Sequence, residues 1–251
     1  LPNGMIYFSD PRYIGDEKKE QKNMAVYRYN PFNGYVELAI GSDIIEKPNG
    51  LGLSPDGKTL YVAETNNGTT GGANDKNNPI IGRMTLNAFP ILSDGSLGKK
   101  KVLIDFGNQT GIDGMTVDTM GNIYAAVRSE NRFGIVAYTP SGKELAYIPT
   151  KSLPTNCCFG KGENSNILYI TAGGGLYQIK MNVSGYHPAT APISKHRNIG
   201  WISLFNGKTT EGWVPRGEFE FFKALNGELH LQSNKNIWIV SQAPATNFAV
   251  E

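Results

Sequence analysis

Short runs of alternating apolar and polar residues occupy much of this chain, and turn-forming residues separate them. Alternation of this kind predicts half-buried β-strands. The runs fall at residues 5–9, 25–29, 35–40, 60–64, 81–86, 102–106, 123–127, 135–138, 144–148, 167–172 and 175–181. No segment repeats its apolar residues at the three- or four-residue spacing of an amphipathic helix. The pattern therefore predicts an all-β protein of short strands.

One phrase recurs along the chain, and each copy turns at a glycine and then enters a strand. The copies are LPNGMIYFSDP from residue 1, PNGLGLSPDGKTLYVAET from residue 48 and IDGMTVDTMGNIYAAV from residue 112. A looser copy, PTNCCFGKGENSNILYIT, starts at residue 154. Repeats of roughly 45–65 residues with about four strands each are typical of β-propeller blades. The repeat therefore predicts successive blades of a propeller.

The repeat also places oxygen-bearing side chains at one equivalent position. The eighth residue before the turn glycines Gly57 and Gly121 is Asn49 or Asp113, and Asn156 takes this place in the looser copy. Equivalent positions in successive repeats converge on a shared point, where amide and carboxylate oxygens suit a hard cation. Asn and Asp also favour turns, so capping of the turn that opens each inner strand is the alternative role for Asn49 and Asp113.

Composition and charge narrow the class of protein. With 251 residues, 39% hydrophobic, 18% charged and 30 glycines, the chain is expected to be a turn-rich globular protein. Its net charge is +2, and no basic stripe interleaved with aromatic residues is present, so no nucleic-acid partner is expected. No apolar run approaches the roughly 20 residues needed to cross a bilayer, so no membrane span is expected.

The chain is expected to contain two domains and to be a piece of a longer protein. Residues 1–183 carry the repeat, residues 184–199 are rich in proline and basic residues and read as a linker, and residues 200–251 alternate again. The first copy starts at residue 1 itself, and residues 248–251 read as a strand cut midway. A periplasmic or secreted location is favoured over a cytoplasmic one. The sequence leaves the oligomeric state open.

Two adjacent cysteines, Cys157 and Cys158, are expected to be buried free thiols. Neighbours in sequence rarely meet disulfide geometry without strain, and unpaired cysteines are generally buried.

The phrases GMIYFSDPRY, KPNGLGLSPDGKTLYVAET, GIDGMTVDTMGNIYAA and LPTNCCFGKGENSNILYITAGGGLYQI resemble the gluconolactonase family, which includes senescence marker protein (regucalcin) and the luciferin-regenerating enzyme. The resemblance implies about three and a half blades of a six-bladed β-propeller. The phrase from Trp201 to Trp213 resembles the opening W-x-x-LFNGK-x-x-x-GW of the domain named after 3-keto-disaccharide hydrolase. That resemblance implies the beginning of a concanavalin-like β-sandwich.

The family resemblance implies a lactonase in carbohydrate catabolism, with one divalent cation at the mouth of the central channel. The cation is expected to be Ca²⁺, with Zn²⁺ or Mn²⁺ as alternatives, and Asn49 and Asp113 to be two of its ligands. The resemblance implies two further ligands, a Glu of the first blade and an Asn before the GMIYFSDP phrase. Asp113 would act as the general base on the water that attacks a sugar lactone.

Three further residues are expected to contact the substrate. Asn156 is placed to bind a sugar hydroxyl, and Arg12 and Tyr13 follow a turn on a rim loop. An ordinary solvated arginine is the alternative for Arg12.

Two other functions stay open at the level of sequence. One is a non-catalytic propeller that binds a carbohydrate or a protein. The other is a glycoside-cleaving enzyme that acts on 3-keto sugars through the second domain.

Overall fold

The computed structural model describes residues 4–13, 21–68, 81–188, 205–234 and 238–241. These residues form strands and turns, with no α-helix among them and one 3₁₀ turn, η2 (Gly162–Asn164). The predicted all-β class is confirmed. The chain divides into two compact units, residues 1–195 and 196–251.

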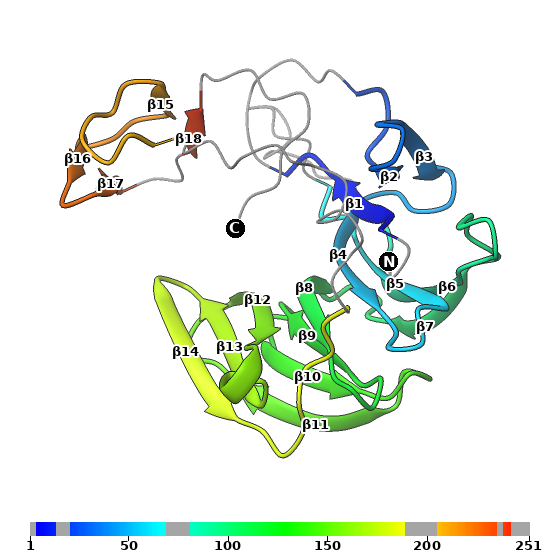
Figure 1. The fold of residues 1–251 in the computed structure, drawn as a ribbon. Coiled ribbons are helices and arrows are strands. Elements are labelled where there is room, and N and C mark those ends of the chain that lie inside the picture. The colour runs from blue at the N-terminus through cyan, green and yellow to red at the C-terminus, as the bar shows by residue number, and fades with distance from the viewer. Residues whose placement is uncertain (1–3, 14–20, 69–80, 189–204, 235–237, 242–251) are drawn as a thin grey trace. The chain divides into compact units, whose positions relative to one another are not determined.

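The first unit contains antiparallel sheets that follow one another in chain order, coloured from blue through cyan and green to yellow-green (Figure 1). The first sheet has β1 (Ile6–Asp10), β2 (Ala25–Tyr29) and β3 (Val36–Ile40). The second has β4 (Pro48–Leu53), β5 (Thr59–Thr65), β6 (Met84–Pro90) and β7 (Lys101–Asp105). The third has β8 (Ile112–Val117), β9 (Ile123–Val127), β10 (Gly134–Tyr138) and β11 (Glu144–Pro149). The fourth has β12 (Pro154–Phe159), β13 (Ile167–Ala172) and β14 (Gly175–Lys180).

The described part of the first unit thus has two four-stranded sheets between two three-stranded ones, in keeping with the partial propeller that the resemblance implies. Strand β6 begins three residues later than the predicted run at 81–86. The reason is that Ile81 is 58% exposed, and the Gly82 amide closes a loop by donating to the carbonyl of Asn66. The turn glycines Gly57 and Gly121 have φ values of 68° and 87°, which a side chain would strain.

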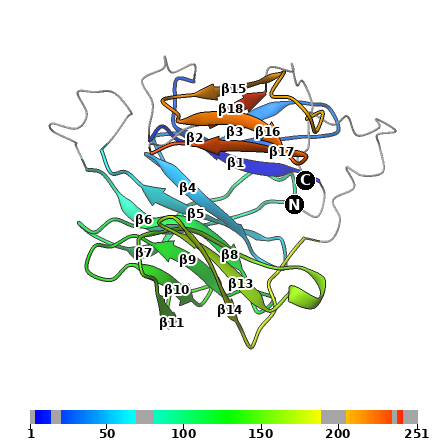
Figure 2. The same ribbon diagram turned by 90° about the vertical axis from the view of Figure 1, so that its left-hand side faces the viewer.

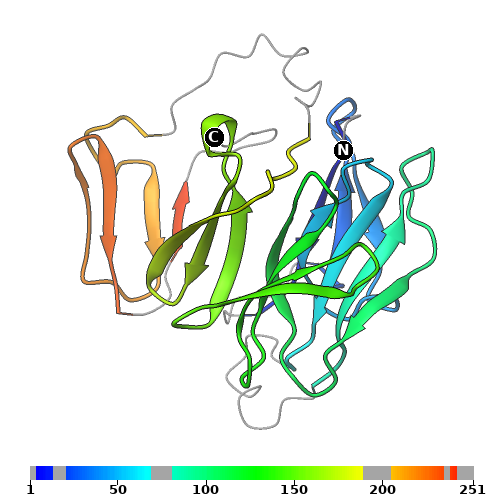
Figure 3. The ribbon, with the colours of Figure 1, turned by 90° about the horizontal axis from the view of Figure 1, so that it is seen from below.

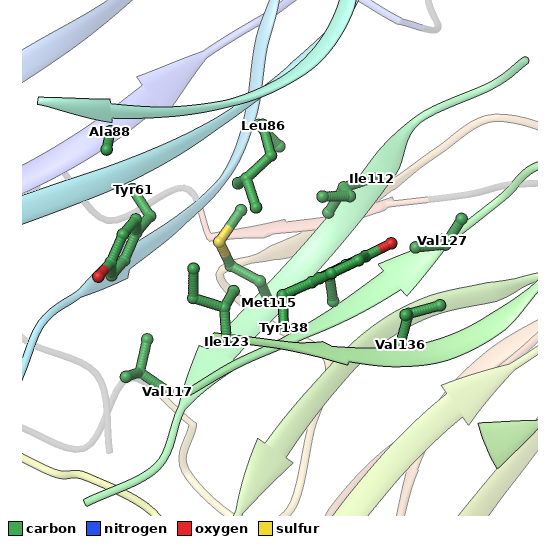
Figure 4. Packing of buried hydrophobic residues seen from close by; sticks show 12 residues of the cluster. Tyr61, Leu86, Ala88, Ile112, Met115, Val117, Ile123, Val127, Val136 and Tyr138 are labelled. Carbon is green, nitrogen blue, oxygen red and sulfur yellow. The ribbon is translucent and has the colours of Figure 1, made fainter. Parts of the chain in front are cut away.

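Apolar side chains fill the space between neighbouring sheets. The largest cluster joins the β4–β7 and β8–β11 sheets, with Tyr61, Leu86, Met115 and Tyr138 among its members (Figure 4). Other clusters join the first sheet to the second and the third to the fourth. The β8–β11 sheet therefore packs on both faces, and strand β9 is buried throughout (Figures 1 and 2).

Two sequence expectations around the fourth sheet need comment. Cys157 is buried, but Cys158 is exposed, because successive strand residues point to opposite faces of a sheet. The expectation that both thiols are buried was therefore wrong. Gly185, in the segment expected to be a linker, forms a β-bridge with Asp118, and the Tyr186 amide donates to the carbonyl of Val117 at 2.8 Å.

The second unit is also built from antiparallel strand pairs. Strand β15 (Trp213–Arg216) pairs with β18 (Trp238–Ser241), and β16 (Phe221–Leu225) pairs with β17 (Glu228–Gln232) (Figure 3). Asn226 and Gly227 join β16 to β17 with φ values of 52° and 82°, the geometry of a tight hairpin turn. Trp201 lies outside the described residues. The domain boundaries and the β-sandwich assignment stay predictions.

Candidate functional site

The predicted ligand positions lie near the starts of the inner strands. Asn49 is the second residue of β4, and Asp113 is the second residue of β8. In both strands the pairing with the next strand shifts at this point, so that Asn49 and Gly50 together oppose Ala63. The register of β8 shifts in the same place. Bulges of this kind re-aim side chains, and both residues lie within strands and not in turns.

Two glycines let the inner strands approach each other closely. A Cβ atom on Gly50 would lie 3.0 Å from the Cα of Gly114, and a Cβ atom on Gly114 would lie 2.8 Å from Nδ2 of Asn156. Each glycine directly follows a predicted ligand, Asn49 or Asp113. The structure therefore brings the starts of β4, β8 and β12 together, as the repeat predicted.

The Asp113 carboxylate lies in a partly buried polar environment. The guanidinium Nη1 of Arg128 lies 3.2 Å from its Oδ2, and the Asn49 side chain is a further hydrogen-bonding neighbour. Burial raises the pKa of Asp113 above its usual value, although Arg128 and Asn49 act in the opposite direction. A further positive charge at this carboxylate would therefore be stabilising.

Tyr13 reaches the same cluster from the segment after β1. Its hydroxyl donates to the carbonyl of Thr65 at 2.9 Å, and the Asn49 side chain is its hydrogen-bonding neighbour. Burial, followed by the negative charge of Asp113, raises the pKa of the Tyr13 phenol. The structure thus places Tyr13 beside both predicted ligands. Arg12, the preceding residue, is partly buried, and its contact with a substrate stays a prediction.

Asn156 lies on the other side of Asp113, against Gly114. Its Oδ1 accepts a hydrogen bond from the Cys157 amide at 2.8 Å, which leaves its NH₂ group as the donor for a ligand. The side chain is exposed. Its role in binding a sugar hydroxyl stays a prediction.

Two residues near the site were missed from sequence. Lys47 is fully buried, and its ammonium lies 4.0 Å from the centre of the Tyr13 ring and donates to Oδ1 of Asn67 at 2.9 Å. Arg128 donates both to Asp113 and, at 3.0 Å, to the carbonyl of Pro154. No local pattern marks either residue, because one contact depends on a loop and the other on strand pairing.

Another buried acid, Glu64, is already paired. Its carboxylate accepts from Arg83 Nε at 2.8 Å and lies 3.6 Å from Lys100 Nζ. The hydroxyl of Thr85 and the amide of Glu46 also donate to it. Glu64 therefore has little capacity left for a metal ion.

The donor set suits a hard divalent cation. Asn49 and Asp113 offer an amide and a carboxylate oxygen at converging strand starts, and the buried Asp113 would gain from a cation. Among the residues that the structure describes, no group of three His, Cys, Asp or Glu side chains could hold a metal ion. Asn49 and Asp113 therefore fit such an ion as two of its ligands, with further oxygen ligands still required.

Comparison with known proteins identifies the family. The family described as "SMP-30/Gluconolactonase/LRE-like region" matches residues 1–174. The chain belongs to this family. The match confirms the resemblance read from the repeated phrases. It does not reach residues 200–251, whose assignment stays a prediction.

Relatives in the SMP-30/gluconolactonase family include two named hydrolases. A gluconolactonase of Zymomonas mobilis is 30% identical over 193 residues, which cover 73% of this chain and 49% of that protein. The lactonohydrolase oryH of Aspergillus oryzae is 29% identical, over 66% of this chain and 35% of that protein. The chain thus spans about half the length of the Zymomonas protein and about a third of the length of the fungal one.

Solved structures of the family share the fold. A gluconolactonase from Xanthomonas campestris superposes with a TM-score of 0.56 at 24% identity, over 74% of this chain and 55% of that one. A regucalcin from Agrobacterium tumefaciens, described as a calcium-binding protein, gives 0.55 at 21% identity, over 74% and 61%. These similarities confirm the partial propeller.

In the part of the chain that the structure describes, no helix is long and apolar enough to cross a membrane. The periplasmic or secreted location stays a prediction.

Proposed function

We propose that the protein containing this chain hydrolyses a sugar lactone with the help of a divalent cation held by Asn49 and Asp113. The main support for this proposal is that Asn49 and Asp113 converge at equivalent bulges of β4 and β8. Family membership and relatives named gluconolactonase and lactonohydrolase support the reaction class.

Each residue of the cluster has a role in this reaction. A bound divalent cation supplies Lewis-acid polarisation of the lactone carbonyl. Asp113 accepts the proton of the attacking water at a carboxylate oxygen, which requires the water within hydrogen-bonding reach. Asn49 holds Asp113 and Tyr13 in place. The Tyr13 hydroxyl and the Asn156 amide bind sugar hydroxyls, and the half-buried setting limits the water around Asp113.

The proposed cation is Ca²⁺, with Zn²⁺ or Mn²⁺ as alternatives. The atoms of Asn49 and Asp113 that would bind the cation are oxygens, and oxygen ligands favour hard cations over zinc. The proposed substrate is a small sugar lactone, and the proposed setting is the breakdown of carbohydrates. For residues 200–251 we propose the beginning of a 3-keto-disaccharide hydrolase-like β-sandwich, which the strand pairs β15–β18 and β16–β17 support.

The test is hydrolysis of glucono-δ-lactone, followed by pH-stat, in the protein at its full natural length. We expect activity that falls in EDTA and returns with Ca²⁺. Asp113→Asn is expected to lower kcat by about 100-fold or more, because general-base catalysis contributes on that scale. Asp105→Asn is the matched control, since Asp105 is exposed at the end of β7 and its carboxylate accepts a hydrogen bond from the nearby Gly107 amide at 2.8 Å.

Equal activity in the Asp113 and Asp105 variants would refute the assignment of the base. A stable protein that binds Ca²⁺ but hydrolyses no lactone would instead favour a carbohydrate-binding propeller.

A further inference from the structure

Arg128 connects the proposed metal ligand to the neighbouring sheet. It directly follows β9, and its amide donates to the carbonyl of Gly111 at 2.9 Å, which fixes its backbone beside the start of β8. One guanidinium nitrogen, Nη1, then donates to Oδ2 of Asp113 at 3.2 Å and to the carbonyl of Pro154 at 3.0 Å. Arg128 is therefore held both at its backbone amide and at its guanidinium group.

This anchoring restricts what the Asp113 carboxylate can offer. A carboxylate binds a metal ion through one oxygen or through both. The guanidinium holds Oδ2, and the arginine is itself restrained by Pro154 of the next sheet. Oδ1 is then the oxygen that a cation can approach closely, and its second lone pair is the one that accepts the proton of the attacking water.

We propose that Arg128 is a positioning residue that limits Asp113 to one-oxygen coordination and so shifts the metal preference of the site from Ca²⁺ toward smaller cations such as Mn²⁺. This inference rests on the metal site of the proposed function. Ca²⁺ takes six to eight oxygens and accepts two-oxygen carboxylates, whereas Mn²⁺ prefers an octahedron of six. The loss of one available oxygen therefore weakens Ca²⁺ binding more than Mn²⁺ binding.

The charge of Arg128 acts differently from its hydrogen bond. A positive charge near the site weakens the binding of both divalent cations to a similar extent. The hydrogen bond to Oδ2 weakens Ca²⁺ selectively. The ratio of the two dissociation constants therefore reports the hydrogen bond, and their common change reports the charge.

The experiment measures Ca²⁺ and Mn²⁺ binding by isothermal titration calorimetry in the full-length protein. Arg128→Met removes both the charge and the donor, and Arg128→Lys keeps a charged donor. Arg132→Met is the matched control, because Arg132 also pairs with a carboxylate, Glu144 at 2.6 Å, at the exposed end of the same sheet. Thermal unfolding of each variant verifies that it is folded.

We expect both cations to bind Arg128→Met more tightly, and Ca²⁺ to gain about tenfold more than Mn²⁺, the scale on which residues behind metal ligands act. Arg128→Lys should keep the wild-type ratio within about threefold, and Arg132→Met should change neither constant. An unchanged ratio in Arg128→Met, with Ca²⁺ and Mn²⁺ still binding, overturns this inference and leaves the proposed function standing. Failure of the wild-type protein to bind either cation overturns both.

Discussion

Gly50 of β4 and Gly114 of β8 face each other so closely that a Cβ atom on Gly50 would lie 3.0 Å from the Cα of Gly114. The atoms that it would meet belong to the backbone of Asp113 and Gly114, which cannot rotate away. The inner strands can pack this closely at the site because Gly50 has no side chain.

Replacing Gly50 by alanine should therefore separate the starts of β4 and β8. We expect a loss of about 1–3 kcal/mol in the free energy of unfolding, the usual cost of overpacking. Urea denaturation would measure it. Gly174→Ala is the control, because no heavy atom of the described residues lies within 4 Å of the place that its Cβ would take. Equal stability of the two variants would show that the strands can part without cost.

Asp118, at the turn after β8, is fully buried and organises that turn. Its carboxylate accepts from the amides of Met120 and Asn122, each at 2.8 Å, and from the Tyr124 hydroxyl at 3.2 Å. Asp118→Ala would leave these donors without their acceptor, and we expect it to cost about 3 kcal/mol of stability. Asp118→Asn keeps one acceptor oxygen and should cost less. The melting temperatures of the two variants would reveal the order, and the reverse order would contradict this account.

The adjacent cysteines should differ in reactivity. Cys158 is exposed, whereas Cys157 is 4% exposed and its thiol donates to the carbonyl of Tyr124 at 3.2 Å. Burial also raises the pKa of the Cys157 thiol, which suppresses the reactive thiolate. A thiol reagent such as DTNB should label one thiol per native chain and both in denaturant. Cys158→Ser should abolish the native reaction, and labelling that persists in this variant would refute the assignment.

Stability should decline at alkaline pH through buried tyrosines. Burial, reinforced by the negative charge of Glu144, raises the pKa of Tyr138 from its usual value of 10.0 to about 12. The folded state therefore holds this proton more tightly than the unfolded state. The contribution is fully present below about pH 10 and is lost as the pH rises toward 12, by up to about 3 kcal/mol. Tyr138→Phe should flatten the decline in denaturation curves between these pH values. An equally steep decline in the variant would assign it to other groups.

The fold and part of the candidate site could be predicted from the sequence. The repeat was sufficient for the strand order and for the meeting of Asn49, Asp113 and Asn156, because equivalent positions in stacked repeats share one geometry. Strand β6 was placed too early, because Ile81 reads as apolar although it is exposed. The roles of the three polar residues stay predictions.

Arg128 and Lys47 could not be found in the same way. Arg128 reaches Asp113 only because β9 returns antiparallel to β8, and Lys47 is buried under the ring of Tyr13 from a different sheet. Long-range contacts of this kind leave no trace in local hydrophobic patterning. The exposure of Cys158 was missed because average burial of cysteine was applied to a residue whose face is set by strand alternation.

Strand β9 contributes side chains to two cores at once, since Ile123 and Ala125 pack against the second sheet while Tyr124 and Ala126 pack against the fourth. A strand that is shared in this way cannot open toward either neighbour without disrupting both. Its amide protons should therefore exchange with deuterated water only through the global unfolding of these sheets. Because Arg128 directly follows this strand, we expect the geometry around Asp113 to be anchored to a slowly exchanging part of the first unit.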